Sequence, residues 1–189
     1  MKLISKLLAL ILFFGFVAAN AAEKYTLDPH HSSVMWTINH LGFSNPSGKW
    51  FAEGTLVLDE KNPADSKVNV TISVGDIVTG ITELDKHLKS ESFFDVKKFP
   101  VATFVSDKII MTGKHTAKVK GMLTMHGVSK PITLNMKLNK AGMNPISNKK
   151  SVGFSGTAEL KRSEFGITTL LPMLGDDVKL DIQAEGYLS

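Results

Sequence analysis

Residues 121–138, GMLTMHGVSKPITLNMKL, form the stretch that decides the fold class. From residue 132 onward apolar and polar side chains alternate, so that Ile132, Leu134 and Met136 share one face. Successive side chains of a β-strand point to opposite sides, and this alternation therefore predicts a strand with one dry face and one wet face. A short turn at residues 126–129 joins it to a second strand of the same kind. The stretch is predicted to be a β-hairpin.

The same pattern recurs along the chain with little helix between the repeats. Strands are predicted over residues 34–39, 49–59, 67–74, 101–107, 116–125, 132–139, 151–161 and 178–188. Turn residues separate them, and about eight short strands at even spacing favour a sandwich or barrel. Two segments differ. Residues 82–90 pair Leu84 with Leu88 at a helical spacing behind Thr82, a plausible N-cap, and residues 167–175 form an apolar loop that Pro172 keeps out of a sheet interior.

The first residues predict an export signal. Lys2 and Lys6 precede a short apolar run, and Ala19-Asn20-Ala21 has the small-residue pattern of a cleavage site. We expect residues 1–21 to be a signal peptide that is removed, which leaves one domain over residues 22–189 in the periplasm or outside the cell. An uncleaved N-terminal anchor is the alternative reading.

Composition excludes several classes of function. The chain has no cysteine, so it has neither disulfides nor a thiolate nucleophile. Without Lys2 and Lys6 there are 20 basic residues against 18 acidic ones, a net charge of +2. These basic residues are spread along the sequence, whereas nucleic-acid binding needs a concentrated basic surface. We expect no nucleic-acid partner.

Catalytic and metal-binding patterns are weak. His30, His31 and His40 would form a metal site only if the fold brought them together, and adjacent histidines on an extended segment point apart. The sequence contains no G-x-S-x-G elbow and no glycine-rich phosphate loop. We therefore expect no enzyme activity, no cofactor and no metal. A metal- or stress-related binding protein and a small-substrate enzyme stay open as alternatives.

Four groups of residues in order along the chain resemble one family. They are LDPHHS at 27–32, DKHLKSESFFD at 85–95, GMLTMHGVSKP at 121–131 and GFSGTAELKRSEFGI at 153–167. Together they span nearly all of the mature chain, and in this order they resemble the YceI-like family. The resemblance implies an all-β fold, an eight-stranded antiparallel lipocalin-like β-barrel with a short helix and apolar cover loops. It also implies a homodimer without stable membrane insertion.

The resemblance further implies a carrier that holds a long isoprenoid, such as a polyprenyl or quinone-like tail, or a fatty-acid amide. An eight-stranded barrel is just wide enough to be filled by side chains or to hold one small ligand, so a packed core is the alternative. If a ligand binds, we expect the barrel lining to include Val34, Trp36, Ile38, Val70, Ile72, Phe104, Leu123, Met136 and Phe154. We expect the cover to come from Phe43, Phe93, Phe94, Leu170, Leu171 and Met173.

Polar contacts to a ligand head group are predicted at His40, Ser90 and Arg162. Arg162 has an alternative role, because an unpaired buried charge is costly and a guanidinium pairs readily with a carboxylate. Asp85 and Asp177 are its candidate partners.

Overall fold

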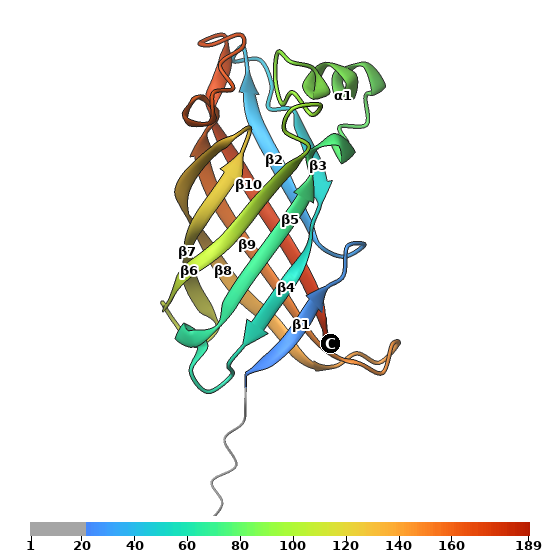
Figure 1. Cartoon of the computed structure of the whole chain (residues 1–189), viewed down its shortest axis with the longest axis vertical. Helices are drawn as coiled ribbons and strands as arrows, with labels where there is room; N and C mark the ends of the chain where they lie inside the picture. Colours follow the sequence, from blue (N-terminus) through green and yellow to red (C-terminus); the bar gives the residue numbers. More distant parts are fainter. Residues whose placement is uncertain (1–21) are drawn as a thin grey trace, which may run out of the picture.

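The computed structural model describes residues 22–189, so the predicted signal peptide lies outside the described residues. Ten β-strands, one α-helix and three short 3-10 helices follow one another along the chain (Figure 1). The elements are β1 (Glu23–Leu27), β2 (Ser33–His40), β3 (Ser47–Phe51), β4 (Glu53–Leu58), η1 (Pro63–Asp65), β5 (Lys67–Ser73), η2 (Val74–Asp76), α1 (Thr82–Lys89), β6 (Val101–Met111), β7 (Thr116–Met125), β8 (Val128–Met143), β9 (Lys150–Lys161), η3 (Arg162–Phe165) and β10 (Leu174–Leu188).

The strands close into an antiparallel barrel whose wall has eight strand positions, as predicted, although ten strands build it. Antiparallel neighbours run in the order β1-β4-β5-β6-β7-β8-β9-β10, and β10 pairs again with β1. The remaining two strands continue the first two positions. The last residues of β10 pair with β1, while its residues 174–183 pair with β2. Likewise β4 pairs with β1 and β3 pairs with β2. Two of the eight positions are therefore each built from two shorter strands.

The break between β1 and β2 is fixed by hydrogen bonds to β10. The Asp28 amide donates to the Glu185 carbonyl (2.7 Å), and the buried Ser32 hydroxyl donates to the same carbonyl (3.1 Å). The Ala52 amide, at the break between β3 and β4, donates to the Ser32 carbonyl (3.0 Å). Both breaks thus lie side by side, and each keeps its backbone groups satisfied.

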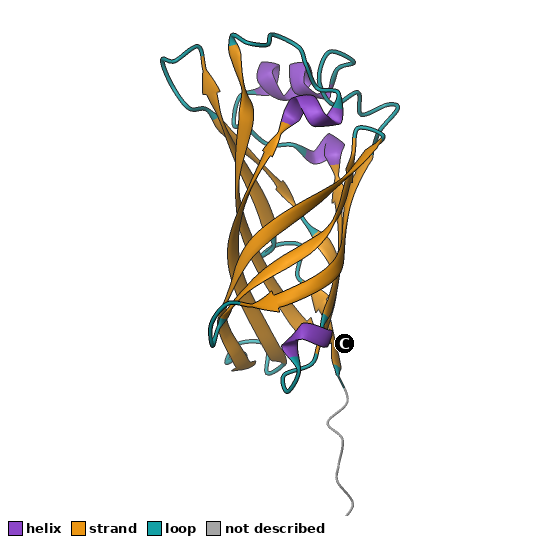
Figure 2. Ribbon diagram, turned by 90° about the vertical axis from the view of Figure 1, so that its left-hand side faces the viewer, coloured by secondary structure: helices purple, strands orange, loops and turns teal. Residues whose placement is uncertain are grey.

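Helix α1 lies at one end of the barrel, opposite the C-terminus (Figure 2). We call this end the mouth and the other end, which carries β1 and the C-terminus, the base. The helix is present as predicted, but it begins at Thr82, so that its N-cap is Ile81 rather than Thr82. The Asp85 carboxylate reaches back over this turn and accepts from the amide (2.8 Å) and hydroxyl (2.6 Å) of Thr79. Among the described residues, no helix is long and apolar enough to cross a bilayer.

The apolar interior has two parts. The first cluster lies toward the mouth and joins barrel strands to α1 and the segment after it. Its buried members are Trp36, Ile38, Trp50, Val74, Ile77, Leu88, Phe93, Ala102 and Ile167. The second cluster, which we call the base cluster, comprises Tyr25, Leu56 and Val152 with Leu58, Val68 and Phe154 packed against them. Tyr25 and Val152 are 0% and 1% exposed, so the base is tightly filled.

Candidate functional site: an apolar cavity inside the barrel

A cavity of about 540 Å³ lies inside the barrel between the base cluster and the mouth, and most residues of the first cluster form part of its wall. Its wall is almost entirely apolar, and Arg162 is the one Lys, Arg, Asp or Glu residue in it. On the deep side, near the base cluster, Leu27, Ala52 and Ala184 belong to the wall. At the mouth, the wall residues His40, Ser44, His87 and Leu170 are exposed. The cavity therefore opens at the mouth, and its volume is within the range of small-molecule sites.

Most residues predicted to contact a ligand lie on this wall. They come from the inner faces of β2, β5, β6 and β7 and from the segments around the mouth. The residues on the wall are Val34, Trp36, Ile38, His40, Val70, Ile72, Phe93, Phe94, Phe104, Leu123, Arg162 and Leu170.

Two predicted lining residues lie elsewhere. Phe154 is opposite Ala184 and packs into the base cluster, below the cavity. Met136 is paired with Gly156, and its sulfur fills the space that a Cβ at Gly156 would need. Alternation assigns both residues to the inner face, but it does not tell how far along the barrel the cavity extends.

Three predicted cover residues also miss the wall. Phe43 is 90% exposed and Met173 is 58% exposed, so both point into solvent. Leu171 follows Leu170, whose φ of +61° turns the backbone, and only Leu170 of the two lies on the wall. Ser90, another predicted head-group contact, instead donates its hydroxyl to the His87 carbonyl (2.7 Å).

Sequence reasoning missed Trp50, and it left the other inward residues of β8 and β10 off the predicted lining. The Trp50 indole donates to the Val74 carbonyl (3.0 Å) and stacks edge-on against Phe94, with ring centroids 5.2 Å apart. Ile132, Leu134, Val178, Leu180 and Ile182 also line the wall. The alternating pattern placed Ile132 and Leu134 on one face, and Val178, Leu180 and Ile182 alternate with polar residues in the same way, so the signal was present. Trp50 follows Lys49 in a short strand, where alternation is too brief to show.

Arg162 neither faces a carboxylate partner nor offers its charge freely to the cavity. Its Nε donates to the Gly175 carbonyl (2.8 Å), and Nη2 donates to that of Leu174 (3.1 Å). Nη1 donates to the Ile167 (3.0 Å) and Thr169 (2.8 Å) carbonyls. Neither Asp85 nor Asp177 pairs with it; Asp177 pairs with Lys161 (2.7 Å). Burial lowers the pKa of the Arg162 guanidinium, and the four carbonyls stabilise its charge.

These bonds organise the loop over residues 166–173, which we call the cover loop. Gly166 has a φ of +76° directly after η3, a conformation that favours glycine. The Thr169 hydroxyl donates to the Ser92 carbonyl, which ties the cover loop to the segment after α1. Just before the cover loop, the Phe165 carbonyl is hydrogen-bonded by Nδ1 of His126 (2.9 Å). Hydrogen bonds from Arg162 and to Ser92 thus hold the cover loop itself, and the bond from His126 holds the residue that precedes it.

One buried donor on the wall has no protein partner. The Trp36 side chain is 8% exposed, and its Nε1 makes no hydrogen bond to any described residue. A buried N–H without an acceptor is costly, and functional sites are where such groups occur. A ligand oxygen that reached Nε1 would remove this cost.

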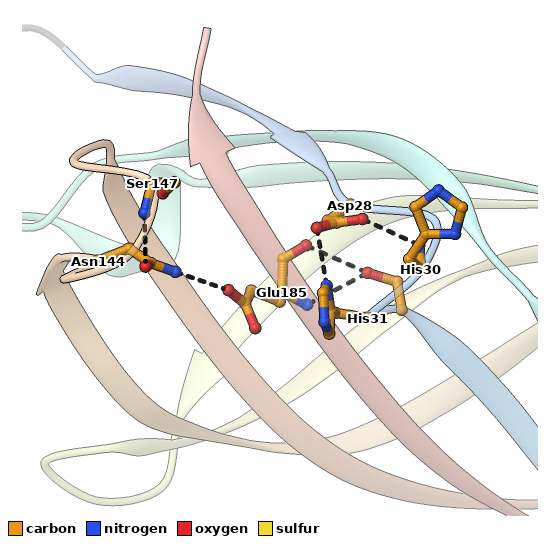
Figure 3. Close-up of polar contacts among 7 residues, drawn as sticks. Asp28, His30, His31, Asn144, Ser147 and Glu185 are labelled. Atoms are coloured by element: carbon orange, nitrogen blue, oxygen red, sulfur yellow. Dashed lines mark hydrogen bonds and ion pairs between the residues drawn. The ribbon is translucent and has the colours of Figure 1, made fainter.

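The histidines do not gather into a metal site. His31 hydrogen-bonds Asp28 through Nδ1 (2.8 Å) on the outside of the barrel, beside Glu185 (Figure 3). His40 lies on the cavity wall at the mouth. Within residues 22–189, no group of three or more His, Cys, Asp or Glu side chains is placed to hold a metal ion. The structure therefore does not support the alternative that relied on His30, His31 and His40.

Comparisons with known proteins agree with this architecture. A crystal structure of Burkholderia cenocepacia BcnA matches with a TM-score of 0.74 at 23% identity, covering 84% of this chain and 98% of that one. The Campylobacter jejuni YceI protein matches with a TM-score of 0.71 at 30% identity, covering 80% and 90% of the two chains. A polyisoprenoid-binding domain from Saccharophagus degradans matches with a TM-score of 0.69 at 14% identity, covering 90% and 100%.

Sequence comparison is more specific. Protein YceI of Salmonella arizonae is 40% identical over 180 residues, which cover 95% of this chain and 93% of that protein. The YceI-like domain matches residues 25–186, nearly all of the described barrel. This chain belongs to the YceI-like family.

Proposed function

We propose that this protein is a carrier that encloses one long amphiphile, an isoprenoid with a polyprenyl or quinone-like tail or a fatty-acid amide, in the barrel cavity. The observation that carries this proposal is the wall: it is apolar, it opens at one end, and its one charged side chain is already bonded to backbone carbonyls. The polyisoprenoid-binding domain of Saccharophagus degradans, which shares the fold, adds support for a lipid of this class.

The energetics favour retention of such a ligand without any catalytic group. Enclosing roughly 500 Å² of apolar tail is worth about 12 kcal/mol at about 25 cal/mol per Å². Association costs about 4–15 kcal/mol, so a long tail is needed for binding and a short one is insufficient.

Cavity size bounds the length of the enclosed tail. If each carbon unit takes about the 30 Å³ of a water molecule, the cavity holds on the order of 20 chain carbons. A longer polyprenyl tail would extend through the mouth. A carbonyl or amide oxygen on the ligand would find a donor at Trp36 Nε1.

We propose binding without chemical turnover and without a cofactor. The wall serine Ser32 uses its hydroxyl on the Glu185 carbonyl. Among the described residues, neither wall histidine, His40 or His87, is hydrogen-bonded through its ring to a hydroxyl group or carboxylate. An activated nucleophile needs such a base, and the small-substrate enzyme therefore has no observation in its favour.

Export and self-association complete the proposal. The signal-peptide pattern of residues 1–21 supports a periplasmic or secreted protein. For a homodimer, the outer wall offers exposed Val101, Val105 and Met122, and Val105 lies directly opposite Met122 on the neighbouring strand. Analytical ultracentrifugation of Val105→Lys tests this: we expect monomers, and an unchanged dimer would exclude this face.

The first experiment is mass spectrometry of an organic extract of gently purified mature protein. We expect one polyprenyl, quinone or fatty amide per chain, and a protein that extracts empty from its native host would contradict the carrier. Ile72→Trp fills the cavity from β5, whereas Thr71→Trp places the same indole on the outer face of that strand. The lipid should be lost only from the first variant, and also from Trp36→Asp, which we expect to stay folded.

A further inference from the structure

The mouth carries an exposed apolar surface formed by two loop tips. We call it the tip surface; it consists of Leu41 (49% exposed), Phe43 (90%), Leu170 (50%) and Met173 (58%). The two loops are joined, because the Leu41 amide donates to the Met173 carbonyl (3.2 Å) and His40 pairs with Leu174. Figure 1 shows both loops at the same end of the barrel, above β2 and β10. Four apolar side chains from distant parts of the sequence therefore form one surface.

The tip surface is continuous with the cavity. Leu170 both lines the cavity and reaches solvent. The residues on either side of the 41–43 tip, His40 and Ser44, are paired as an isolated bridge and both lie on the wall. Phe43 therefore lies at the tip of a turn whose two flanking residues, His40 and Ser44, belong to the opening of the cavity. An apolar ligand leaving the cavity would pass the tip surface.

Both loops combine an unusual backbone conformation with an uncharged sequence. Leu41 and Leu170 have φ angles of +57° and +61°. Bulky residues rarely adopt this region, and such strain occurs mainly at functional sites. Residues 39–47 and 166–175 contain no Asp, Glu, Lys or Arg, in a chain that is 21% charged. Uncharged tips with exposed aromatic and aliphatic side chains are suited to the hydrocarbon edge of a bilayer, where a charged side chain is costly.

We propose that the tip surface docks this protein on a lipid bilayer, so that the cavity mouth faces the membrane and the ligand moves between the two without crossing water. This inference rests on the proposed function, because the bilayer is the place where an isoprenoid or fatty amide resides. A second copy of the chain fits the tip surface less well. An aromatic side chain offers at most about 250 Å², and three of the four side chains are only about half exposed. Their combined area falls short of the roughly 800 Å² per partner in a standard interface.

Vesicle flotation tests the docking. The mature protein is mixed with vesicles of phosphatidylethanolamine and phosphatidylglycerol, and Phe43→Asp is compared with Ile146→Asp. Ile146 is a matched control, because it is 93% exposed in the loop between β8 and β9 at the base. We expect the wild type and Ile146→Asp to float with the vesicles. Phe43→Asp should partition roughly tenfold to a hundredfold more weakly, as the loss of one buried Phe side chain predicts.

Three results would overturn the proposal: a wild type that does not bind vesicles, equal binding by Phe43→Asp, and an equal loss in Ile146→Asp. A dimer that dissociates in Phe43→Asp, with no vesicle binding by the wild type, would assign the surface to a second copy. A separate loading assay adds a fluorescent fatty amide from ethanol, without vesicles. If the wild-type protein takes up the fluorescent amide in this assay but does not bind vesicles, the carrier proposal stands and the docking proposal is wrong. If it does not take up the amide, the carrier proposal itself is wrong.

Discussion

The mouth half and the base half of the barrel share the same strands but use their large side chains differently. At the base, Tyr25, Val152 and Phe154 pack against one another and fill the interior. Toward the mouth, Trp36 and Trp50 lie against each other, with ring centroids 6.4 Å apart, and both belong to the cavity wall. Aromatic content alone therefore does not distinguish a packed barrel from a hollow one. What matters is the contacts that each ring makes.

A substitution in the base cluster should destabilise the protein most. Tyr25→Ala should lower the free energy of unfolding by about 3–5 kcal/mol, because it removes a fully buried aromatic side chain from a close-packed cluster. Leu134→Ala, on the cavity wall, should cost about 2 kcal/mol or less, since this side chain already faces open volume. Urea unfolding of lipid-free protein measures both. Equal losses would mean that the two halves are packed alike.

A smaller effect is expected where Arg162 holds the cover loop. Arg162→Met should cost about 2–4 kcal/mol, because several carbonyls lose hydrogen bonds to a charged donor. Arg162→Lys should be nearly as unstable as Arg162→Met, since an ammonium lacks the planar array of donors that the guanidinium offers. The neighbouring variant Lys161→Met, which removes an exposed ion pair, should change stability little.

Hydrogen exchange locates the effect of Arg162→Met. The Leu174 amide, which donates to the Leu170 carbonyl (2.8 Å), should exchange much faster in this variant, while the Tyr25 amide in the base keeps its protection. Uniformly faster exchange along the chain would contradict a role confined to the cover loop.

The smallest effect concerns the ion pair at the break between β1 and β2. The hydrogen bond to Asp28 raises the pKa of His31, and the same bond lowers the pKa of Asp28. The His31 contribution to stability is present below its unfolded pKa of about 6.5 and is lost as the pH rises through the folded value. The Asp28 contribution is present above about 3.9 and is lost as the pH falls through its folded value.

The pair therefore stabilises most between about pH 4 and pH 6.5. In Asp28→Asn, the His31 ring should titrate at lower pH than in the wild type, as followed by its NMR signals. An unchanged titration would show that the pair does not form in solution. Because both side chains are partly exposed, the effect on stability should be modest.

Alternation in sequence predicted the barrel and most of its inner face, because most of the strands are long enough to show which side chains are buried. Ile72 and Leu123 are examples that lie on the wall as expected. The same signal placed Phe154 and Met136 on the inner face but not at the right depth. Depth depends on strand register and on the size of the opposing residue, such as Ala184 or Gly156, and neither is visible within a single strand.

The loops were harder to predict, for a different reason. Their backbone follows no repeating period, so the local sequence pattern does not indicate which of Leu170 and Leu171 faces the cavity. The left-handed conformation of Leu170 decides this. Arg162 was predicted as a polar residue near the cavity, and it lies there. Its actual partners are carbonyls up to 13 residues away, whose positions follow only from the folded loop.

The beginning of β1 and the end of β10 lie next to each other at the base. Tyr25 pairs with Leu188, and the Ser189 amide donates to the Lys24 carbonyl (2.9 Å). In a chain that begins at residue 22, a short linker would therefore join residue 22 to residue 189 without disturbing the barrel, and new ends opened in the exposed turn around Ile146 would give a circular permutant. A tag or immobilising surface attached after Ser189 would likewise leave the opposite, open end of the barrel accessible.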